Sequence, residues 1–239
     1  MAKLFIVGTP IGNLKDITLR ALETLEQVDY IACEDTRVTS KLLNHYNLKK
    51  SLLNYNKFNE KESAKGIIKL LDQDKNIALV SDAGMPLLSD PGFVLIKEVK
   101  QTNHQIVLIP GVNAAISAFA LANLSNSFVF HCFPKETQNQ RIKQLQELQA
   151  EHSHIFYVAP HKLINLLQDI DQIYANNAKI FLAKELTKMF EQTFEGTAQE
   201  LLNKFKAKES IKGEFTLVLK INQEKHQKIN KYQHFSKNK

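Results

Sequence analysis

The sequence predicts an α/β protein made of two α/β domains, and three observations support this. Short apolar runs that suit buried strands alternate with segments of helical spacing along most of the 239 residues. Loops rich in glycine, proline and aspartate follow many of these runs, as expected of β-loop-α units. A polar, turn-rich segment at 122–127 interrupts the pattern. We therefore predict domains at 1–122 and 128–221.

The first domain is predicted to contain five strands separated by helices. The apolar runs that indicate strands are residues 4–7, 29–33, 51–55, 77–81 and 106–109. Ile17, Ala21 and Leu25 recur at helical spacing within 16–28, and Asp16 stands where a helix cap is expected. Further helices are expected around Leu42 and over 59–71, 93–100 and 113–122. Repeated β-loop-α units favour a mostly parallel sheet with helices on both faces.

The second domain is predicted on the same grounds. Strand-like runs are residues 128–133, 154–158, 179–183, 190–194 and 214–221. Helical segments are residues 138–149, 161–173 and 198–205. Residues 222–239 are rich in Lys, Gln and Asn and nearly lack apolar periodicity, so we expect a basic, polar, disordered tail.

The loops after the strands of the first domain carry the candidate chemistry. The most informative is SDAGMPLLSDPG at 81–92, where two glycines, two prolines and two aspartates follow a buried strand. Three others lie at 8–13, 34–37 and 110–114. Because parallel strands bring their carboxyl ends to one edge, these four loops should line one crevice, where open α/β sheets bind ligands.

Composition narrows the class of protein. A hydrophobic content of 44% and a charged content of 23% are ordinary for a globular domain, and no apolar stretch reaches the roughly 18–20 residues of a membrane span. Two cysteines and the absence of a signal peptide indicate a cytoplasmic location. The net charge of +6 is compatible with a polyanionic partner. The motifs GxGxxG, GxxxxGK(S/T), GxSxG and HExxH are missing, which disfavours NAD, ATP and the common hydrolase sites, and no metal-ligand spacing occurs.

Taken in order, several short motifs resemble those of one family. They are GTPIGNL (8–14), DIT (16–18), EDTR (34–37), the 81–92 loop, PG (110–111), IFY (155–157), PHKL (160–163), KELTK (184–188) and KGE (212–214). The set spans about residues 3–221 and is similar to the ribosomal RNA small subunit methyltransferase I family of the tetrapyrrole methylase superfamily. The resemblance implies two α/β domains of tetrapyrrole methylase type with S-adenosyl-L-methionine (SAM) in the cleft between them. It also implies methylation of the ribose 2'-hydroxyl of a cytidine in small-subunit (16S) rRNA.

The resemblance also implies which residues contact the cofactor. They are Pro10, Asp82, Ala83, Gly84, Met85, Leu88, Asn113, Ala114, Tyr157 and Leu186. Taken alone, the glycines and prolines of the 81–92 loop could simply end a strand, and Tyr157 could belong to the core. Small-subunit rRNA or the small ribosomal subunit is the implied partner, a homodimer is expected, and neither a metal nor a membrane is.

Residues 34–37 are the strongest candidates for catalysis. Two carboxylates and an arginine directly after a buried strand are costly unless paired or used. One interpretation is structural, with an ion pair from Arg37 to Glu34 or Asp35 and a helix cap at Asp35 or Thr36. The other places Arg37 on an RNA phosphate and a carboxylate near the ribose hydroxyl, which must lose its proton during methyl transfer. Lys188 is a further candidate for phosphate or proton handling, and the base stays open.

The chain departs from the family pattern at several positions. Met85 stands where threonine is usual, Val112 and Asn113 replace Pro-Ser, Val158 replaces a glutamate, and Cys132 takes the place of an expected glycine. Two alternatives therefore stay open. One is a C-methyltransferase of tetrapyrrole synthesis, against which the net charge and residues 34–37 argue. The other is a degenerate homologue that binds rRNA without catalysis.

Overall fold

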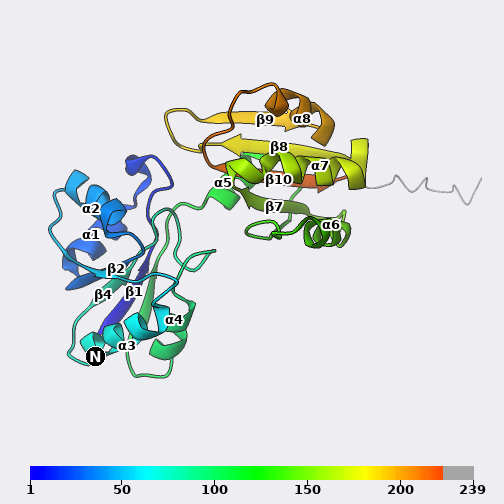
Figure 1. The fold of residues 1–239 in the computed structure, drawn as a ribbon. Coiled ribbons are helices and arrows are strands. Elements are labelled where there is room, and N and C mark those ends of the chain that lie inside the picture. Colours follow the sequence, from blue (N-terminus) through cyan, green and yellow to red (C-terminus); the bar gives the residue numbers. More distant parts are fainter. Residues whose placement is uncertain (223–239) are drawn as a thin grey trace, which may run out of the picture.

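The chain folds into two units, each built on one five-stranded sheet (Figure 1). The structure is a computed structural model and describes residues 1–222. It confirms the predicted α/β class with two sheets. The predicted disordered tail at 222–239 lies outside the described residues, apart from Asn222.

The sheet of the first unit is parallel throughout. Its strands are β1 (Lys3–Val7), β2 (Tyr30–Cys33), β3 (Ser51–Asn54), β4 (Ile77–Leu79) and β5 (Gln105–Ile109). They lie in the order β3-β2-β4-β1-β5, and every neighbouring pair is parallel. The connecting helices are η1 (Leu14–Asp16), α1 (Leu19–Gln27), α2 (Thr36–His45), α3 (Glu60–Leu71) and α4 (Phe93–Val99). All five strands therefore end at the same edge, where the loops that follow them gather.

Helices cover both faces of this sheet. On one face, Leu71 of α3 and Leu95 of α4 are fully buried in a cluster with the strand residue Leu79. On the other face, Leu25 of α1 and Leu43 of α2 are buried in a second cluster. Apolar side chains buried on both faces explain why the strands of this unit consist of continuous apolar runs.

Helix α1 begins two residues later than the sequence predicts. The hydroxyl of Thr18 accepts a hydrogen bond from the Ala21 N–H at 3.1 Å, and Thr18 has the extended backbone of an N-cap. Asp16 instead ends the short helix η1. The predicted cap at Asp16 is thus wrong, because a second capping residue closer to the apolar periodicity is used.

The sheet of the second unit is mixed. Its strands are β6 (Phe128–Phe130), β7 (Ser153–Val158), β8 (Ala178–Lys184), β9 (Gln192–Gly196) and β10 (Phe215–Ile221), in the order β6-β7-β10-β8-β9. β6 and β7 are parallel, and the other neighbouring pairs are antiparallel. The helices are α5 (Ala114–Ala122), α6 (Gln138–Gln146), η2 (Pro160–Lys162), α7 (Leu163–Tyr174), η3 (Ala175–Asn177) and α8 (Ala198–Lys206).

Helix α5 packs on the second sheet, although it precedes the segment 122–127. Ala115, Ala118 and Ala122 form a buried cluster with Phe181 and Val218, and the main contacts of α5 are with β7, β8 and β10 (Figure 1). Helices α6, α7 and α8 supply the buried cluster on the opposite face. The boundary at 122–127 stays a prediction, but this packing favours a boundary before α5.

Candidate functional site

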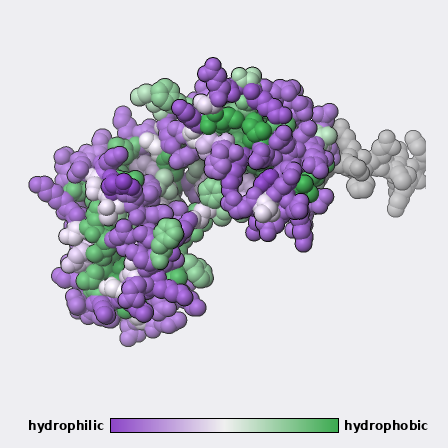
Figure 2. Space-filling view, in the orientation of Figure 1, coloured by the Kyte–Doolittle hydropathy of each residue, from purple (hydrophilic) through white to green (hydrophobic). Residues whose placement is uncertain are grey.

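A cavity of about 460 Å³ lies between the two units. All four predicted edge loops of the first unit contribute to its lining, and the second unit closes it from β7, β8, β10 and their loops. The lining residues are Ile11, Glu34, Asp82, Ala83, Gly84, Met85, Leu88, Ser89, Asp90, Asn113, Ala114, Phe133, Tyr157, Val158, Ala159, Pro160, Ala183, Leu186, Glu214, Phe215 and Thr216. In the space-filling view the two lobes meet at a narrow waist (Figure 2).

Most residues that the resemblance implies for the cofactor line this cavity. They are Asp82, Ala83, Gly84, Met85, Leu88, Asn113, Ala114, Tyr157 and Leu186. Pro10 is the exception: it is buried next to Ile11 and is not part of the lining. The structure therefore brings together residues from both halves of the chain that are up to about a hundred positions apart.

The 81–92 loop is tied to the loop after β1. The Thr9 N–H donates to the Gly84 carbonyl at 2.9 Å, and the Gly84 N–H donates to the Thr9 carbonyl at 3.2 Å. The Thr9 hydroxyl also donates to the Ser81 carbonyl at 3.2 Å. Leu87 and Ser89 both have φ of 76°, in the left-handed region where side chains other than glycine are strained. Such strain is common where backbone surrounds a ligand.

The far end of this loop is fixed by α3 and by the loop after β3. Glu60 Oε1 accepts from the Gly92 N–H at 2.8 Å, and the Tyr55 hydroxyl accepts from the Leu95 N–H at 3.2 Å. These bonds satisfy amides at the start of α4, whose N-cap is Gly92. Asp90, two residues before Gly92, lines the cavity.

The loops after β1 and β5 meet through two glycines. A Cβ on Gly111 would lie 2.8 Å from the Gly8 Cα, and a Cβ on Gly8 would lie 2.6 Å from the Met85 Sδ. Because the first of these neighbours is backbone, it cannot move aside. Met85, at the usual position of a threonine, thus packs against Gly8 while it lines the cavity.

Three carboxyl groups line the cavity on the side of the first unit: Glu34, Asp82 and Asp90. Burial raises the pKa of each, and neighbouring acidic groups add to the shift. The pKa of Asp90 rises to about 6. The Lys57 ammonium, which donates to the Ser89 carbonyl at 2.7 Å, opposes the shift for Glu34 and Asp90. A carboxyl whose pKa lies near neutrality can act as a general base.

Asp35 and Arg37 form a local pair beside these carboxyls. The Asp35 side chain accepts from the Arg37 N–H at 2.8 Å, which caps α2, and Arg37 Nη2 lies 2.7 Å from Asp35 Oδ2. These hydrogen bonds lower the pKa of Asp35 to about 2. Asp35 and Arg37 line a second cavity of about 440 Å³, which shares Glu34 and Asp82 with the first. The structural interpretation of this pair is thus observed, and Arg37 stays accessible with 86% of its side chain exposed.

Lys188 lies apart from the other predicted catalytic residues. Its ammonium is 3.1 Å from Glu185 Oε1 and 2.9 Å from Glu214 Oε2. Burial lowers the pKa of Lys188, but these two hydrogen bonds outweigh burial and hold it above its ordinary value. A Cβ on Gly12 would lie 2.3 Å from the Lys188 Cγ, so the stem of this side chain packs against the first unit. Lys188 lines neither cavity.

Sequence reasoning named Tyr157 and Leu186 on the wall that the second unit contributes but missed Phe133, Phe215 and Thr216. Phe133 is 51% exposed, and its ring lies 5.8 Å from that of Tyr157 in an edge-on arrangement. Phe215 and Thr216 lie at the start of β10. Alternation along a strand predicts which residues two positions apart share a face, but not which surface that face meets. Ser89 also lines the cavity, and its buried hydroxyl has no hydrogen-bond partner within residues 1–222.

Within the described part of the chain, no helix has both the length and the apolar character needed to cross a bilayer. The same residues contain no group of three or more His, Cys, Asp or Glu side chains able to hold a metal ion.

Known proteins resemble this chain in sequence and in fold. The family model described as Tetrapyrrole (Corrin/Porphyrin) Methylases matches residues 3–202. A protein of Mycoplasmopsis pulmonis named Ribosomal RNA small subunit methyltransferase I is 50% identical over 93% of this chain and 100% of its own length. A protein of the same name from Mesomycoplasma conjunctivae is 47% identical over 98% of each chain. The uroporphyrin-III-C-methyltransferase of Thermus thermophilus has a similar fold, with a TM-score of 0.66 at 16% identity over 90% of this chain and 93% of its own.

Proposed function

The chain belongs to the tetrapyrrole methylase family and, within it, to the ribosomal RNA small subunit methyltransferase I proteins, and we propose that it transfers a methyl group from SAM to the ribose 2'-hydroxyl of a cytidine in small-subunit (16S) rRNA. The observation that carries this proposal is the pair of adjoining cavities that share Glu34 and Asp82. The first has the size of a small-molecule site. The second is more open, and its exposed side chains, among them Arg37 and Phe58, are ones that a large substrate can reach.

The lining of the first cavity suits SAM. SAM carries a positively charged sulfonium, a positively charged ammonium and a flat adenine. The three carboxyl groups supply negative charge, and Tyr157 and Leu186 supply apolar surface. The unpartnered hydroxyl of Ser89 can bond a polar group of the ligand. We therefore propose that the lining residues named by the resemblance contact SAM. Pro10 lies behind the lining, and its proposed role is to fix the conformation of its loop.

The residues of the chain must align the ribose hydroxyl and take its proton. Bound SAM supplies an electrophilic methyl group. The ribose hydroxyl would take that methyl group, and its proton would pass to a carboxylate of this chain. Asp90 suits the role of proton acceptor best because its pKa is raised to about 6, so it is ionised at neutral pH yet more basic than an ordinary aspartate. Glu34 and Asp82 border both cavities and can orient the hydroxyl.

We further propose that the protein acts as a homodimer in the cytoplasm. Leu108 on the edge strand β5 is 55% exposed, and Ile116 and Leu121 on α5 are 50% and 52% exposed. Exposed apolar side chains of this size suit burial against a second copy. Sedimentation at micromolar concentration tests the dimer, and a monomer at all concentrations would contradict it.

Methyl transfer to defined substrates tests the proposed function. Purified protein is incubated with labelled SAM and with unmodified small subunits, protein-free rRNA or a precorrin. Label in an alkali-resistant dinucleotide from rRNA supports the proposal, and label in the precorrin supports a tetrapyrrole methyltransferase instead. If the protein neither binds SAM nor transfers its methyl group, both enzyme functions are overturned and an rRNA-binding homologue remains.

Asp90→Asn tests the proposed base. It should lower kcat, measured at saturating SAM, by about 10²- to 10⁴-fold. Asp72→Asn, an exposed aspartate that lines neither cavity, is the control. Equal rates for the Asp90→Asn variant and the unchanged protein would assign the proton transfer to another group.

A further inference from the structure

The second cavity lies at the carboxyl ends of β2, β3 and β4, where the sheet order places these three strands side by side. Its lining combines the Glu34–Arg37 turn with Asp82 and with Asn54, Asn56 and Phe58 from the end of β3 and the loop after it. None of these three β3-side residues has a role in the first cavity. The loop after β3 is therefore a fifth edge loop. Its residues Tyr55 and Lys57 hold the start of α4 and the 81–92 loop, but Asn54, Asn56 and Phe58 have no such role.

Phe58 presents an aromatic ring that the fold does not use. The residue is fully exposed, at 101% of the reference area. Its backbone is nevertheless held, because Asn56 Oδ1 accepts from the N–H groups of Phe58 at 3.0 Å and Asn59 at 3.3 Å. The Asn56 N–H in turn donates to Asn59 Oδ1 at 3.1 Å. A ring fixed at its base and open to solvent is a surface on which a nucleic-acid base can stack.

Asn54 presents two hydrogen-bond donors next to this ring. Its Oδ1 accepts from Asn56 Nδ2 at 2.7 Å, which fixes the orientation of the amide. The two N–H groups of its own amide donate to no acceptor within residues 1–222. Cytosine carries two adjacent acceptors, O2 and N3, whereas uracil carries an acceptor at O2 and a donor at N3. The free donors of Asn54 thus match cytosine better than uracil.

Arg37 presents a cation at the same cavity. A guanidinium has five N–H donors, and Asp35 engages only Nε and one N–H of Nη2. Three donors therefore remain on an exposed side chain whose position Asp35 fixes. This arrangement suits a phosphate oxygen beside a bound nucleoside.

We propose that the second cavity binds the target nucleotide of the RNA, with its pyrimidine base stacked on Phe58, base acceptors bonded to Asn54 and a flanking phosphate on Arg37. The ribose then lies over Glu34 and Asp82, which border the first cavity. The single-stranded or extruded nucleotide required here is the usual substrate of enzymes that read a base edge or modify a nucleotide. This inference rests on the proposed rRNA methyltransferase function.

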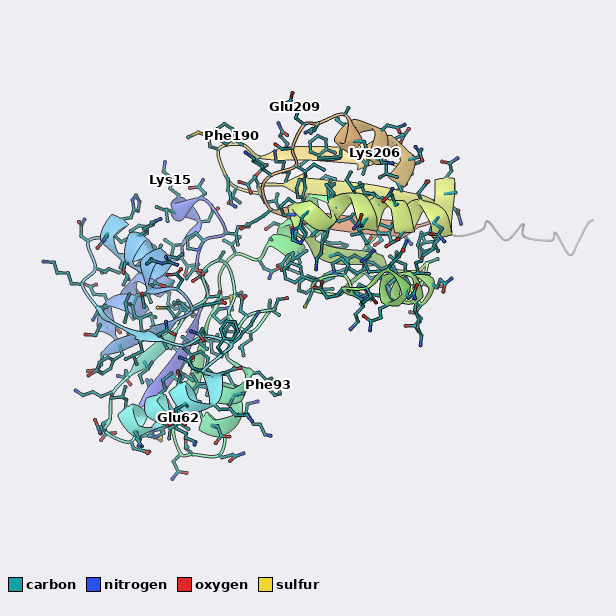
Figure 3. All side chains as sticks on the ribbon, in the orientation of Figure 1. Lys15, Glu62, Phe93, Phe190, Lys206 and Glu209 are labelled. Atoms are coloured by element: carbon teal, nitrogen blue, oxygen red, sulfur yellow. The ribbon has the colours of Figure 1, made fainter. Side chains whose placement is uncertain are left out.

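Substitutions at Phe58 test the stacking. Phe58→Ala should lower kcat/KM for rRNA by about 5- to 150-fold, mainly through KM, with the SAM Kd unchanged. Phe58→Trp, which keeps an aromatic face, should retain activity. Phe93→Ala is the matched control: Phe93 is another exposed phenylalanine of the first unit, 74% exposed at the start of α4, and it lines neither cavity (Figure 3). Equal losses for the variants at 58 and 93, or no loss at 58, overturn the proposal.

An abasic substrate separates this inference from the proposed function. Binding of a short single-stranded RNA with one central cytidine is compared with that of the same RNA lacking only that base. The base deletion should weaken binding to the unchanged protein and have little further effect on Phe58→Ala, because both changes remove one contact. If rRNA is methylated but the two losses are additive, the nucleotide site is wrong and the proposed function stands. If rRNA is not methylated, the proposed function fails, and the binding cycle still decides whether the cavity takes a base.

Asn54→Asp tests the reading of the base edge. Aspartate keeps the acceptor that Asn56 and Asn59 use but removes both amide donors. The preference for a central cytidine over a central uridine should therefore fall, while any effect of the added charge applies equally to both RNAs. An unchanged preference removes Asn54 from the proposal.

Discussion

The two units face the same cavity with opposite kinds of surface. The first supplies backbone loops, three carboxyl groups and two left-handed non-glycine residues within the 81–92 loop. The second supplies strand and loop residues that form a mainly apolar wall, including Tyr157 and Phe215, with Glu214 as its carboxyl. Topology explains the contrast. In a parallel sheet every strand ends at one edge, so all β-α loops gather there, whereas a mostly antiparallel sheet divides its loops between two edges. We infer that the first unit supplies most of the reactive groups and that the second unit mainly sets the shape of the cavity.

The largest expected effect is a loss of stability in the second unit that leaves SAM binding unchanged. The carboxyl of Asp169 is 2% exposed and lies 2.7 Å from Arg141 Nε, and Gln138 donates to its other oxygen at 3.2 Å. Asp169→Ala leaves a buried guanidinium without its partner and should lower the free energy of unfolding by about 3–5 kcal/mol in urea titrations. The SAM Kd of the folded protein should not change. The exposed pair of Lys65 and Glu62 is the control, because Lys65→Ala should cost at most about 0.5 kcal/mol.

The next largest effect is expected from a substitution that distorts the loops of the first unit at the cavity. Gly111→Ala forces its Cβ against the backbone of Gly8 at 2.8 Å. We expect a loss of about 1–3 kcal/mol in the free energy of unfolding and a SAM Kd at least about tenfold weaker by titration calorimetry. Gly66→Ala is the matched control, since nothing lies within 4 Å of a Cβ at that helical position. That change should stabilise the protein by about 0.5–1 kcal/mol. Unchanged SAM affinity in Gly111→Ala would show that this glycine contact does not shape the cavity.

The two units should respond to pH with opposite sign. In the first, Asp90 has a pKa raised from 3.8 to about 6, mainly by burial. Its contribution to stability is present below about pH 4 and is lost as the pH rises through about 6. In the second, burial and the neighbouring His154, whose Nδ1 lies 2.9 Å from His131 Nε2, lower the pKa of His131 from 6.5 to about 4. Its contribution is present above pH 6.5 and is lost as the pH falls through about 4.

Urea titrations of Asp90→Asn and His131→Asn between pH 4 and pH 7 measure these slopes. Relative to the unchanged protein, Asp90→Asn should become more stable as the pH rises, and His131→Asn less stable, each by on the order of 1–3 kcal/mol. Parallel curves for a variant and the unchanged protein would mean that the group does not titrate differently in the folded state.

The smallest effect concerns the one position of the second unit where a glycine was expected. Cys132 has φ of 60°, so its backbone lies in the left-handed region. Cys132→Gly should relieve this strain and raise the free energy of unfolding by about 0.5–1 kcal/mol, which thermal unfolding can detect. Cys132→Ala retains the Cβ and should show no such gain. A gain of equal size in the alanine variant would point to the thiol rather than the backbone.

Local patterns predicted the strands and most helices because each depends on a short period of apolar residues. They also predicted that the loops after β1, β2, β4 and β5 would meet, because parallel strands share an edge. Local patterns could not predict that Glu60 would bond the start of α4, or that Lys188 would pack beside Gly12. Those contacts depend on which elements become neighbours after folding.

The sequence by itself determined the α/β class, the parallel arrangement of the first half and the motifs that join the chain to its family. Glycine, proline and aspartate after a buried strand indicated the 81–92 loop directly, whereas the individual cofactor candidates came from the resemblance to the family. Only the tertiary structure decided that α5 packs on the second sheet and that the loop after β3 adjoins Glu34 and Asp82. For the loop after β3 the physical reason is the order β3-β2-β4-β1-β5, because it sets which loops become neighbours, and no short stretch of sequence carries that order.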